Sequence, residues 1–333
     1  MSKALGLEAG DRPGPLRRLD VWRDLDQVAR LLNVVFGDEA AAMGRSVSRE
    51  FDLLRFAAPV ASLHALFSDG FAGVFGGFVW EENGRIVGNV SVGKVDKSGQ
   101  RWMIANVAVH PSYRRRGIAR QLTQTAVDEA VRRGARAVVL DVRADNEPAR
   151  TLYLSMGFQF LDCKARFRLA HALRRDWSVQ PGYEICQLPP YDRSRILPLV
   201  LAATPQTVQK LLPIRTRDYA VSWWRGIGTS FVHSLCGETE RIFGVQRGGE
   251  LVGIAEIVVR KWSSLHRFSM LTHPDHAAHV SNTLVGRSLA GLQHYAPRPV
   301  VAEIRSGRQA EAEALRAYGF TELETLETLV YWP

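Results

Sequence analysis

The chain has 333 residues, of which 46% are hydrophobic and 23% are charged, and its formal net charge is +9. This composition predicts a folded globular protein of about two domains and excludes a disordered chain. No apolar run approaches the roughly 20 residues of a membrane-spanning helix, and no apolar signal core precedes the fold, so we expect a cytoplasmic protein without membrane contact. The three cysteines, Cys163, Cys186 and Cys236, form no CxxC pair or disulfide framework, which fits that compartment.

The first half of the chain predicts a mixed α/β domain. A strand is expected over residues 16–20, and the apolar side chains of the next segment recur on one face of a helix over 24–36. Residues 37–70 are expected to be mostly helical and irregular. Strands over 71–80 and 86–95 flank the turn signal Glu82-Asn83-Gly84 and predict a hairpin. The later elements are a strand over 102–109, a strand over 137–143, a helix over 148–156 and a final pair of strands within 158–170.

A basic, glycine-containing turn follows the strand over 102–109. It reads Arg114-Arg115-Arg116-Gly117-Ile118-Ala119, and a helix is expected to begin at once and to run to about Arg133. The first N–H groups of a helix lack intrahelical partners and the helix dipole is positive there, so this succession of elements binds phosphate. Because Gly117 has no Cβ, the backbone can approach a pyrophosphate closely, and Ala119 keeps the next contact small.

Positive charge is concentrated around this turn. Between Arg101 and Arg168 there are 13 Arg and Lys residues against 6 Asp and Glu residues, an excess of seven (13 − 6). The excess favours attraction of a polyanionic ligand such as coenzyme A. A solvated helix face is the alternative, and we expect it for Arg132, Arg133 and Arg136. Nucleic acid is not expected, because the basic residues are not interleaved with aromatic ones and no nucleic-acid motif occurs.

Two motifs resemble those of a known family. The turn Arg114-x-x-Gly117-x-Ala119 resembles the Q/R-x-x-G-x-G/A pyrophosphate loop of the GNAT superfamily of acyl-CoA-dependent N-acyltransferases. Asn146-x-x-Ala149-x-x-Leu152-Tyr153-x-x-x-Gly157-Phe158 resembles the second signature of that family. A short glycine pattern is weak evidence by itself, but two signatures in order with a β–loop–α–β pattern between them are strong. The resemblance implies a GNAT-like fold with a mixed sheet.

The resemblance also implies that acetyl-CoA binds as the acyl donor. The central strands of the family splay apart beside the loop, and the exposed backbone groups pair with the pantetheine arm as if it were another strand. The cofactor-binding residues implied here are Val107, Ala108, Val109, Arg114, Arg115, Arg116, Gly117, Ile118, Ala119, Arg120, Asn146 and Tyr153. An N-terminal helix cap ahead of Pro148 is a second role for Asn146.

By the same resemblance, the reaction is direct transfer of an acetyl group to a primary amine, without a covalent enzyme intermediate. Tyr153 matches the tyrosine that donates a proton to the departing sulfur of CoA, and its alternative role is packing against the sheet. Asp141, twelve residues earlier (153 − 141), is the candidate base. The ribosomal-protein alanine N-terminal acetyltransferases, which this stretch resembles most, have a glutamate there. An ion pair with Arg143 or Arg101 is the alternative for Asp141.

Other acids are weaker candidates for the base. Glu81 and Glu82 lie at the end of the predicted hairpin, where exposed acids are usually only solvated. Many relatives also have an acid in the strand before the phosphate loop, where this chain has Asn106. Several acids are therefore candidates for the base, with Asp141 the first of them.

The chain contains a degenerate internal repeat. His110-Pro111 recurs as His273-Pro274, and Met156-Gly157-Phe158 recurs as Tyr318-Gly319-Phe320, separated by 47 residues in the first copy (157 − 110) and 46 in the second (319 − 273). Two further landmarks recur in register: Gly84-Arg85-Ile86-Val87-Gly88 as Gly249-Glu250-Leu251-Val252-Gly253, and Val138–Arg143 as Val300–Arg305. A period this long predicts two domains in tandem. We expect a catalytic, CoA-binding domain at residues 1–176, a linker at 177–182 and a degenerate, non-catalytic domain at 183–333.

The second copy lacks the motif residues of the first. In the alignment on His273-Pro274, a valine replaces the loop glycine and puts a branched side chain where phosphate would lie. We therefore expect no CoA binding and no catalysis in this copy. The aligned replacements are Val280 for Gly117, Asn282 for Ala119, Ala277 for Arg114, Leu315 for Tyr153 and Arg308 for Asn146.

Two other groups of residues could suggest functional sites. His273, His276 and His279 lie close in sequence, but no cysteine or acidic set completes a zinc site, so no metal is expected. Tyr219 and the pair Trp223-Trp224 could line an acceptor pocket, although such aromatic residues are more often core.

The acceptor remains open at this point. Tandem members of the family similar to mycothiol synthase acetylate a small amino sugar conjugate, whereas the surroundings of Asp141 suggest a peptide or protein N-terminus. Specificity is expected to reside in residues 37–70, the Glu81–Gly84 hairpin and the second copy. An acyl-CoA-binding regulatory module without turnover is the competing function. Acyl-chain length and oligomeric state are also open.

Overall fold

The computed structural model describes residues 15–42, 76–95, 99–171, 176–188, 193–211, 238–260, 265–305 and 307–333. The predictions for residues 43–70, for Cys236 and for the aromatic residues Tyr219, Trp223 and Trp224 lie outside these ranges. None of the helices within them is long and apolar enough to cross a membrane.

Two compact units make up the chain. The first comprises the described parts of Met1–Gly37 and Val47–Leu140 together with Trp332–Pro333, and the second comprises those of Asp38–Ser46 and Asp141–Tyr331. Each unit is described separately below.

The first unit is built on a mixed sheet. Strands β1 (Leu16–Arg18), β2 (Gly77–Glu82), β3 (Arg85–Lys94) and β4 (Arg101–Val109) are antiparallel neighbours in chain order, and β4 pairs in parallel with the start of β5 (Ala137–Arg143). Asn83 and Gly84 connect β2 to β3 with positive φ values of 51° and 75°, as a two-residue hairpin turn requires. The predicted early hairpin and later parallel crossover are therefore confirmed.

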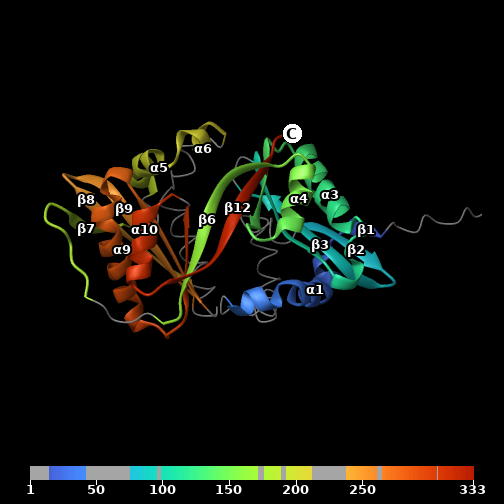
Figure 1. Cartoon of the computed structure of the whole chain (residues 1–333), viewed down its shortest axis with the longest axis horizontal. Helices are drawn as coiled ribbons and strands as arrows, with labels where there is room; N and C mark the ends of the chain where they lie inside the picture. The colour runs from blue at the N-terminus through green and yellow to red at the C-terminus, as the bar shows by residue number, and fades with distance from the viewer. Residues whose placement is uncertain are drawn as a thin grey trace, which may run out of the picture. The chain divides into compact units, whose positions relative to one another are not determined.

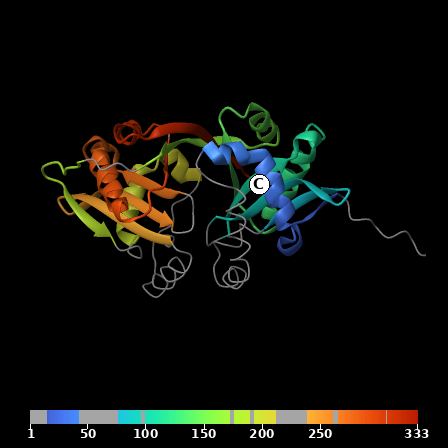
Figure 2. The ribbon, with the colours of Figure 1, turned by 90° about the horizontal axis from the view of Figure 1, so that it is seen from below.

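Two helices cover the opposite faces of this sheet. The helix α1 (Val21–Ala42) lies below the strands in Figure 1 and in front of them in Figure 2, and α3 (Ile118–Arg132) lies on the other side. Ile118 and Leu122 of α3 approach Gly88 so closely that a Cβ there would lie 2.9 Å from each, which explains the glycine. The cluster between α1 and the sheet consists of Val28, Leu31, Leu32, Val79, Ile86 and Ala108.

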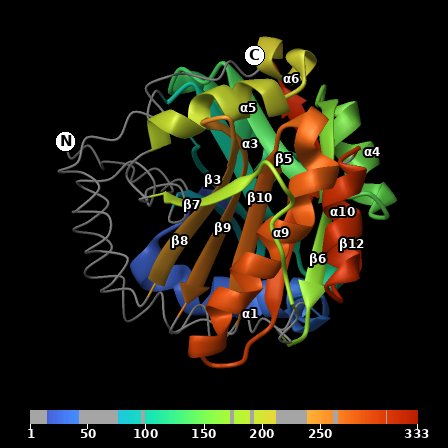
Figure 3. The ribbon, with the colours of Figure 1, turned by 90° about the vertical axis from the view of Figure 1, so that its left-hand side faces the viewer.

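The second unit has a larger sheet. Its strand order is β12-β6-β11-β10-β9-β8-β7, with β6 (Gln159–Leu169), β7 (Glu184–Leu188), β8 (Glu238–Arg247), β9 (Glu250–Arg260), β10 (His266–Thr272), β11 (Val300–Arg305) and β12 (Thr321–Tyr331). Figure 3 shows α9 (Ala277–Gly291) across β8, β9 and β10, with α10 (Gln309–Ala317) beside it. The remaining helices are α4 (Glu147–Ser155), α5 (Leu197–Ala203) and α6 (Gln206–Leu211).

The end of the first sequence copy differs from the prediction. A single strand, β6, replaces the pair expected within residues 158–170, because this stretch contains no glycine, proline or asparagine that would favour a turn. It lies between β11 and β12 of the second copy and is antiparallel to both. The division between the two compact units falls between Leu140 and Asp141 in this part of the chain. The division into domains at 1–176 and 183–333 stays a prediction about the repeat.

Polar side-chain contacts between these strands occur in pairs that are related by the internal repeat. Arg166 on β6 donates to Glu303 on β11 at 2.9 Å, and Thr328 on β12 donates to Asp141 on β5 at 2.7 Å. Each residue of one contact has its counterpart in the other contact 162 residues away, since Thr328 corresponds to Arg166 and Glu303 to Asp141 (328 − 166 and 303 − 141). A second pair with the same offset joins Arg305 to Asp162 at 3.1 Å and Arg143 to Glu324 at 3.7 Å. The tandem repeat expected from the sequence thus has a counterpart in side-chain contacts.

Candidate cofactor and catalytic site

The turn after β4 has an unusual backbone. A short 3-10 turn, Pro111–Tyr113, follows β4, and the His110 ring accepts a hydrogen bond from the Ser112 N–H at 3.3 Å. Arg115 and Gly117 then have positive φ values of 65° and 77°, and Gly117 is the residue immediately before α3. Glycine adopts this conformation without strain, whereas an arginine there is uncommon. The backbone therefore reverses twice within three residues and exposes its polar groups.

The N–H groups of residues 115–119 have no hydrogen-bond acceptor among the described residues. Intrahelical bonding begins with Gln121, whose N–H donates to the Gly117 carbonyl at 3.1 Å. A Cβ at Gly117 would meet only the Gln121 amide nitrogen, at 3.8 Å, so the space above the glycine is open. Consecutive unpartnered N–H groups at the positive end of a helix are suited to an anion.

The arginines of the turn differ in how they are held. The Arg116 guanidinium stacks over the Tyr113 ring at 4.8 Å and lies 3.8 Å from the Glu82 carboxylate. Arg114 donates to the Val109 carbonyl at 3.4 Å. Arg115 is exposed and has no acidic partner within the described ranges. Arg115 is therefore the guanidinium most available to a phosphate.

The parallel pairing of β4 with β5 ends before β4 reaches the turn. Its register with β5 runs from Arg101 to Ile104, opposite Ala137 to Leu140. Residues 105–109 pair with β3 alone in the register of the described strands. Among the described strands, the backbone of Val107, Ala108 and Val109 consequently has one side without a neighbouring strand.

Tyr153 lies on α4, whose start is fixed by Asn146. The Asn146 side chain accepts a hydrogen bond from the Ala149 N–H at 3.3 Å, so the cap that the sequence suggested is present. Tyr153 is 6% exposed, and its ring lies 5.9 Å from that of Phe158. Its hydroxyl has no hydrogen-bond partner in the described part of the chain. Burial disfavours the phenolate and raises the pKa of Tyr153 to about 12, so the hydroxyl keeps its proton at physiological pH.

Asp141 is engaged at both oxygens. Lys164 pairs with one carboxylate oxygen at 2.7 Å and Thr328 donates to the other at 2.7 Å. The structural alternative of an ion pair is thus present, although its partner is Lys164 and not Arg143 or Arg101. Arg143 pairs with Asp145 instead. Each carboxylate oxygen retains a second lone pair, and the Asp141 side chain is 27% exposed, so Asp141 can still accept a proton.

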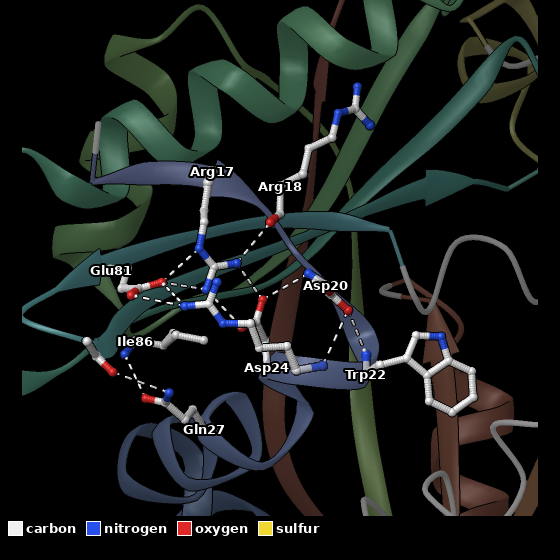
Figure 4. A network of polar contacts seen from close by, with 10 residues as sticks. Arg17, Arg18, Asp20, Trp22, Asp24, Gln27, Glu81 and Ile86 are labelled. Atoms are coloured by element: carbon white, nitrogen blue, oxygen red, sulfur yellow. Dashed lines mark hydrogen bonds and ion pairs between the residues drawn. The ribbon is translucent and has the colours of Figure 1, made fainter. Parts of the chain in front are cut away.

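The hairpin acids belong to structural networks. Figure 4 shows the Glu81 carboxylate beside the Arg17 guanidinium, which donates to it at 2.8 Å. Arg23 also pairs with Glu81 at 3.3 Å, and Arg17 binds the fully buried Asp24 at 2.6 Å. Burial favours the neutral form of Asp24, but hydrogen bonds from Arg17 and the Asp20 N–H outweigh it and lower the pKa of Asp24. Glu82 accepts a hydrogen bond from the Trp80 indole at 3.0 Å. Neither hairpin acid is placed as a free base.

Part of the chain matches a known protein family. Residues 39–158 match the model of the acetyltransferase (GNAT) family. The chain contains a GNAT-family domain. It is 45% identical over 53 residues to the [ribosomal protein bS18]-alanine N-acetyltransferase of Escherichia coli (strain K12), covering 16% of this chain and 36% of the relative. It is 33% identical over 99 residues to the N-alpha-acetyltransferase RimI of Mycobacterium tuberculosis (strain ATCC 25618 / H37Rv), covering 28% and 61%. The chain therefore matches less than two thirds of the length of either relative.

The tandem arrangement also has a solved counterpart. A tandem GNAT protein from the clavulanic acid biosynthesis pathway, determined without AcCoA, superposes with a TM-score of 0.61 and 17% identity. The match covers 95% of this chain and 98% of the other. At this identity the likeness concerns the fold alone, and it confirms the predicted GNAT fold in two copies.

The second copy has no loop equivalent to that of the GNAT domain. Its helix α9 begins at Ala277, directly after the 3-10 turn Pro274–His276. A Cβ at Gly253 would lie 3.0 Å from Val280 and from Leu284, as a Cβ at Gly88 would lie close to Ile118 and Leu122. This packing equates Ile118 with Val280, so the residue that replaces Gly117 is His279 and not Val280. The alignment on His273-Pro274 is therefore wrong by one residue at this position. The turn of the first copy is one residue longer, since Ile118 follows His110 by eight residues and Val280 follows His273 by seven (118 − 110 against 280 − 273).

The three histidines of the second copy are held by protein groups. The Nδ1 atoms of His276 and His279 lie 3.0 Å from the Tyr183 hydroxyl and 2.8 Å from the Gln180 side-chain oxygen. His273 accepts from the Asp275 N–H at 3.3 Å. No group of histidine, cysteine and acidic side chains within the described ranges could hold a metal ion.

A small cavity in the first unit lies away from this turn. Its volume is about 150 Å³, and its walls include Arg18, Lys94, Trp102, Glu129 and Arg133. Glu129 is near the C-terminal end of α3, about 18 Å along the helix from Gly117 at 1.5 Å per residue. The cavity is therefore no part of the candidate cofactor site.

Proposed function

We propose that the chain is an acetyl-CoA-dependent N-acetyltransferase whose first copy binds the cofactor and carries out the transfer to a primary amine. The observation that carries the proposal is the row of unpartnered N–H groups at residues 115–119 around the open Gly117. The family match at residues 39–158 supports it. The enzyme classification of the chain rests on the same two findings.

The roles of the individual residues follow from their surroundings. The turn from Arg115 to Ala119 would hold the pyrophosphate, and the open side of Val107 to Val109 would pair with the pantetheine arm. Acetyl-CoA supplies the activated acyl group when it is bound. Asn146 would act mainly by fixing the start of α4, which carries Tyr153.

Tyr153 is proposed to act on the departing sulfur. A thiol has a pKa of about 8.5, so complete proton transfer from a phenol of pKa about 12 is unfavourable by roughly 3.5 pKa units. Intrinsic pKa values of phenol and thiol lie closer, and burial of Tyr153 separates them. We therefore assign Tyr153 first as a neutral hydrogen-bond donor that stabilises the developing thiolate.

The acceptor is proposed to be the free amine of a peptide or protein N-terminus. The relatives in Escherichia coli and Mycobacterium tuberculosis support this class, since they are named as an alanine N-acetyltransferase for a ribosomal protein and as an N-alpha-acetyltransferase. A small amine metabolite is the second candidate, which the tandem architecture favours.

A panel of amines tests the activity. Purified protein is incubated with acetyl-CoA and either peptides with different first residues or small amines, and both thiol release and the acetylated product are measured. We expect acetylation of the α-amine in at least one peptide. Binding of acetyl-CoA with no product from any amine would instead support the acyl-CoA-binding module without turnover.

Asp141 remains the candidate base, and its contacts determine the test. Asp141→Asn is expected to lower kcat roughly 100-fold, the low end for a general base. Thr328→Val removes the contact at one carboxylate oxygen but retains the acid, so it should leave kcat close to that of the wild-type protein. An unchanged kcat in the Asp141 variant would assign this residue to the ion pair with Lys164 alone.

A further inference from the structure

We propose that Asn89 is a positioning residue whose buried side chain holds a one-residue bulge in β4 and so orients the backbone that receives the pantetheine arm. This inference rests on the proposed function, because it concerns the same cofactor site. Asn89 was not among the residues that the motifs pointed to. Three observations carry it.

The first observation is the bulge. Asn89 of β3 faces Ala108, and Ser91 faces Ala105, so the single residue Val90 between them is opposed by two, Asn106 and Val107. Asn106 has a φ of 52°. Glycine is usual at this left-handed position of a bulge, and asparagine is among the few other residues that adopt it readily.

The second observation is the clamp on that bulge. The Asn89 side-chain nitrogen donates to the Asn106 carbonyl at 3.0 Å, and the Asn106 side-chain nitrogen donates to the Ser91 hydroxyl at 3.2 Å. Asn89 is 0% exposed, and its side-chain oxygen is buried without a partner in the described part of the chain. A fully buried amide with an unsatisfied oxygen is unfavourable for folding. The clamp is thus better explained by the conformation it imposes on Asn106 than by stability.

The third observation is the second copy, which serves as an internal control. Its strands β9 and β10 pair from Arg267 opposite Val258 to Thr272 opposite Gly253 without a shift in register. Ile104 and Phe268 are equivalent, because they pair with the equivalent residues Leu140 and Ala302. Ile104 precedes His110 by six residues and Phe268 precedes His273 by five, so the second copy is one residue shorter here and has no counterpart of Asn106. The positions of the clamp are taken by Ile254 for Asn89 and by Glu256 for Ser91. The copy without the phosphate loop therefore also lacks the bulge and the clamp.

The bulge matters because of where it occurs. An extra residue changes which of the following backbone groups face the neighbouring strand and which face away. It lies just beyond Ile104, where the pairing of β4 with β5 ends. The bulge therefore sets which backbone groups of Val107 to Val109 face the side of β4 that paired with β5 up to Ile104.

The test separates the pantetheine arm from the phosphates. Titration calorimetry is run with acetyl-CoA and with ADP, which carries the adenosine and the pyrophosphate of the cofactor but no arm. Asn89→Leu is expected to weaken acetyl-CoA binding roughly tenfold, the effect of one lost hydrogen bond, and to leave ADP binding within about twofold. Asn106→Val, which penalises the left-handed conformation, should behave alike.

Two further variants complete the design. Asn106→Gly keeps the positive φ and should retain most of the acetyl-CoA affinity. Asn83→Gly replaces an exposed asparagine with a φ of 51° in the β2–β3 turn and should change nothing. Equal acetyl-CoA affinity in the Asn89→Leu and wild-type proteins, or equal loss of both ligands with a lowered melting temperature, would overturn the positioning role. Failure of the wild-type protein to bind acetyl-CoA would instead overturn the proposed function.

Discussion

Replacement of Tyr153 by phenylalanine is expected to lower kcat roughly 10²–10⁴-fold while changing the KM for acetyl-CoA little. The Tyr153 side chain is 6% exposed, and its hydroxyl is protonated and has no partner among the described residues. Removal of the hydroxyl therefore costs no existing hydrogen bond there and should leave the fold intact. Steady-state kinetics with an accepted amine measures the effect. Tyr331→Phe is the matched control, because the Tyr331 ring also lies beside Phe158, at 5.6 Å, and the substitution removes the same atom. A similar loss in both variants would contradict a specific role of Tyr153.

The pH dependence gives a second readout of the same residue. Because burial raises the pKa of Tyr153 to about 12, its neutral form prevails throughout the range in which such enzymes are assayed. Its ionisation can reduce kcat only as the pH rises toward that value. Any loss of activity at lower pH therefore arises elsewhere and should persist, with the same midpoint, in Tyr153→Phe.

Replacement of Gly117 by valine is expected to weaken acetyl-CoA binding at least roughly 100-fold. A β-branched residue is strained at the φ of 77°, and its side chain would occupy the open space toward which the N–H groups of the loop point. Loss of two or more charge-assisted hydrogen bonds would account for the magnitude. Titration calorimetry with acetyl-CoA measures it.

The control for this variant lies at the other end of the same helix. Gly134 has a φ of 86° and nothing within 4 Å of a Cβ, so Gly134→Val imposes similar backbone strain away from the loop. It should bind acetyl-CoA like the wild-type protein. Equal binding by both valine variants would mean that the loop does not hold the cofactor.

Local patterns in the sequence predicted most of the first unit. The apolar spacing of residues 24–36, the Asn83-Gly84 turn and the strand before the basic loop each depend on neighbours within a few residues. The partners of β6 could not be predicted in this way, because Arg168 and Thr321 pair across more than 150 residues of chain. The prediction of two strands within 158–170 failed for this reason, since the second strand is supplied by β12.

The site shows the same limit. The motifs identified Gly117 and Asn146, whose conformations are set by adjacent backbone. They did not identify the partner of Asp141, because Lys164 lies on another strand. The one-residue difference between the copies at Asn106 was the only sequence signal for the bulge, and the signal that Asn89 clamps it came from the register of β3 and β4.

The number of acetyl-CoA molecules bound per chain tests the central claim most directly. Equilibrium dialysis of the full-length protein with labelled acetyl-CoA is expected to give one site per chain. This result would follow from a loop in the first copy and from its absence in the second, where α9 begins at Ala277. Two sites per chain would contradict the degenerate second copy, and no binding would contradict the proposed acetyltransferase.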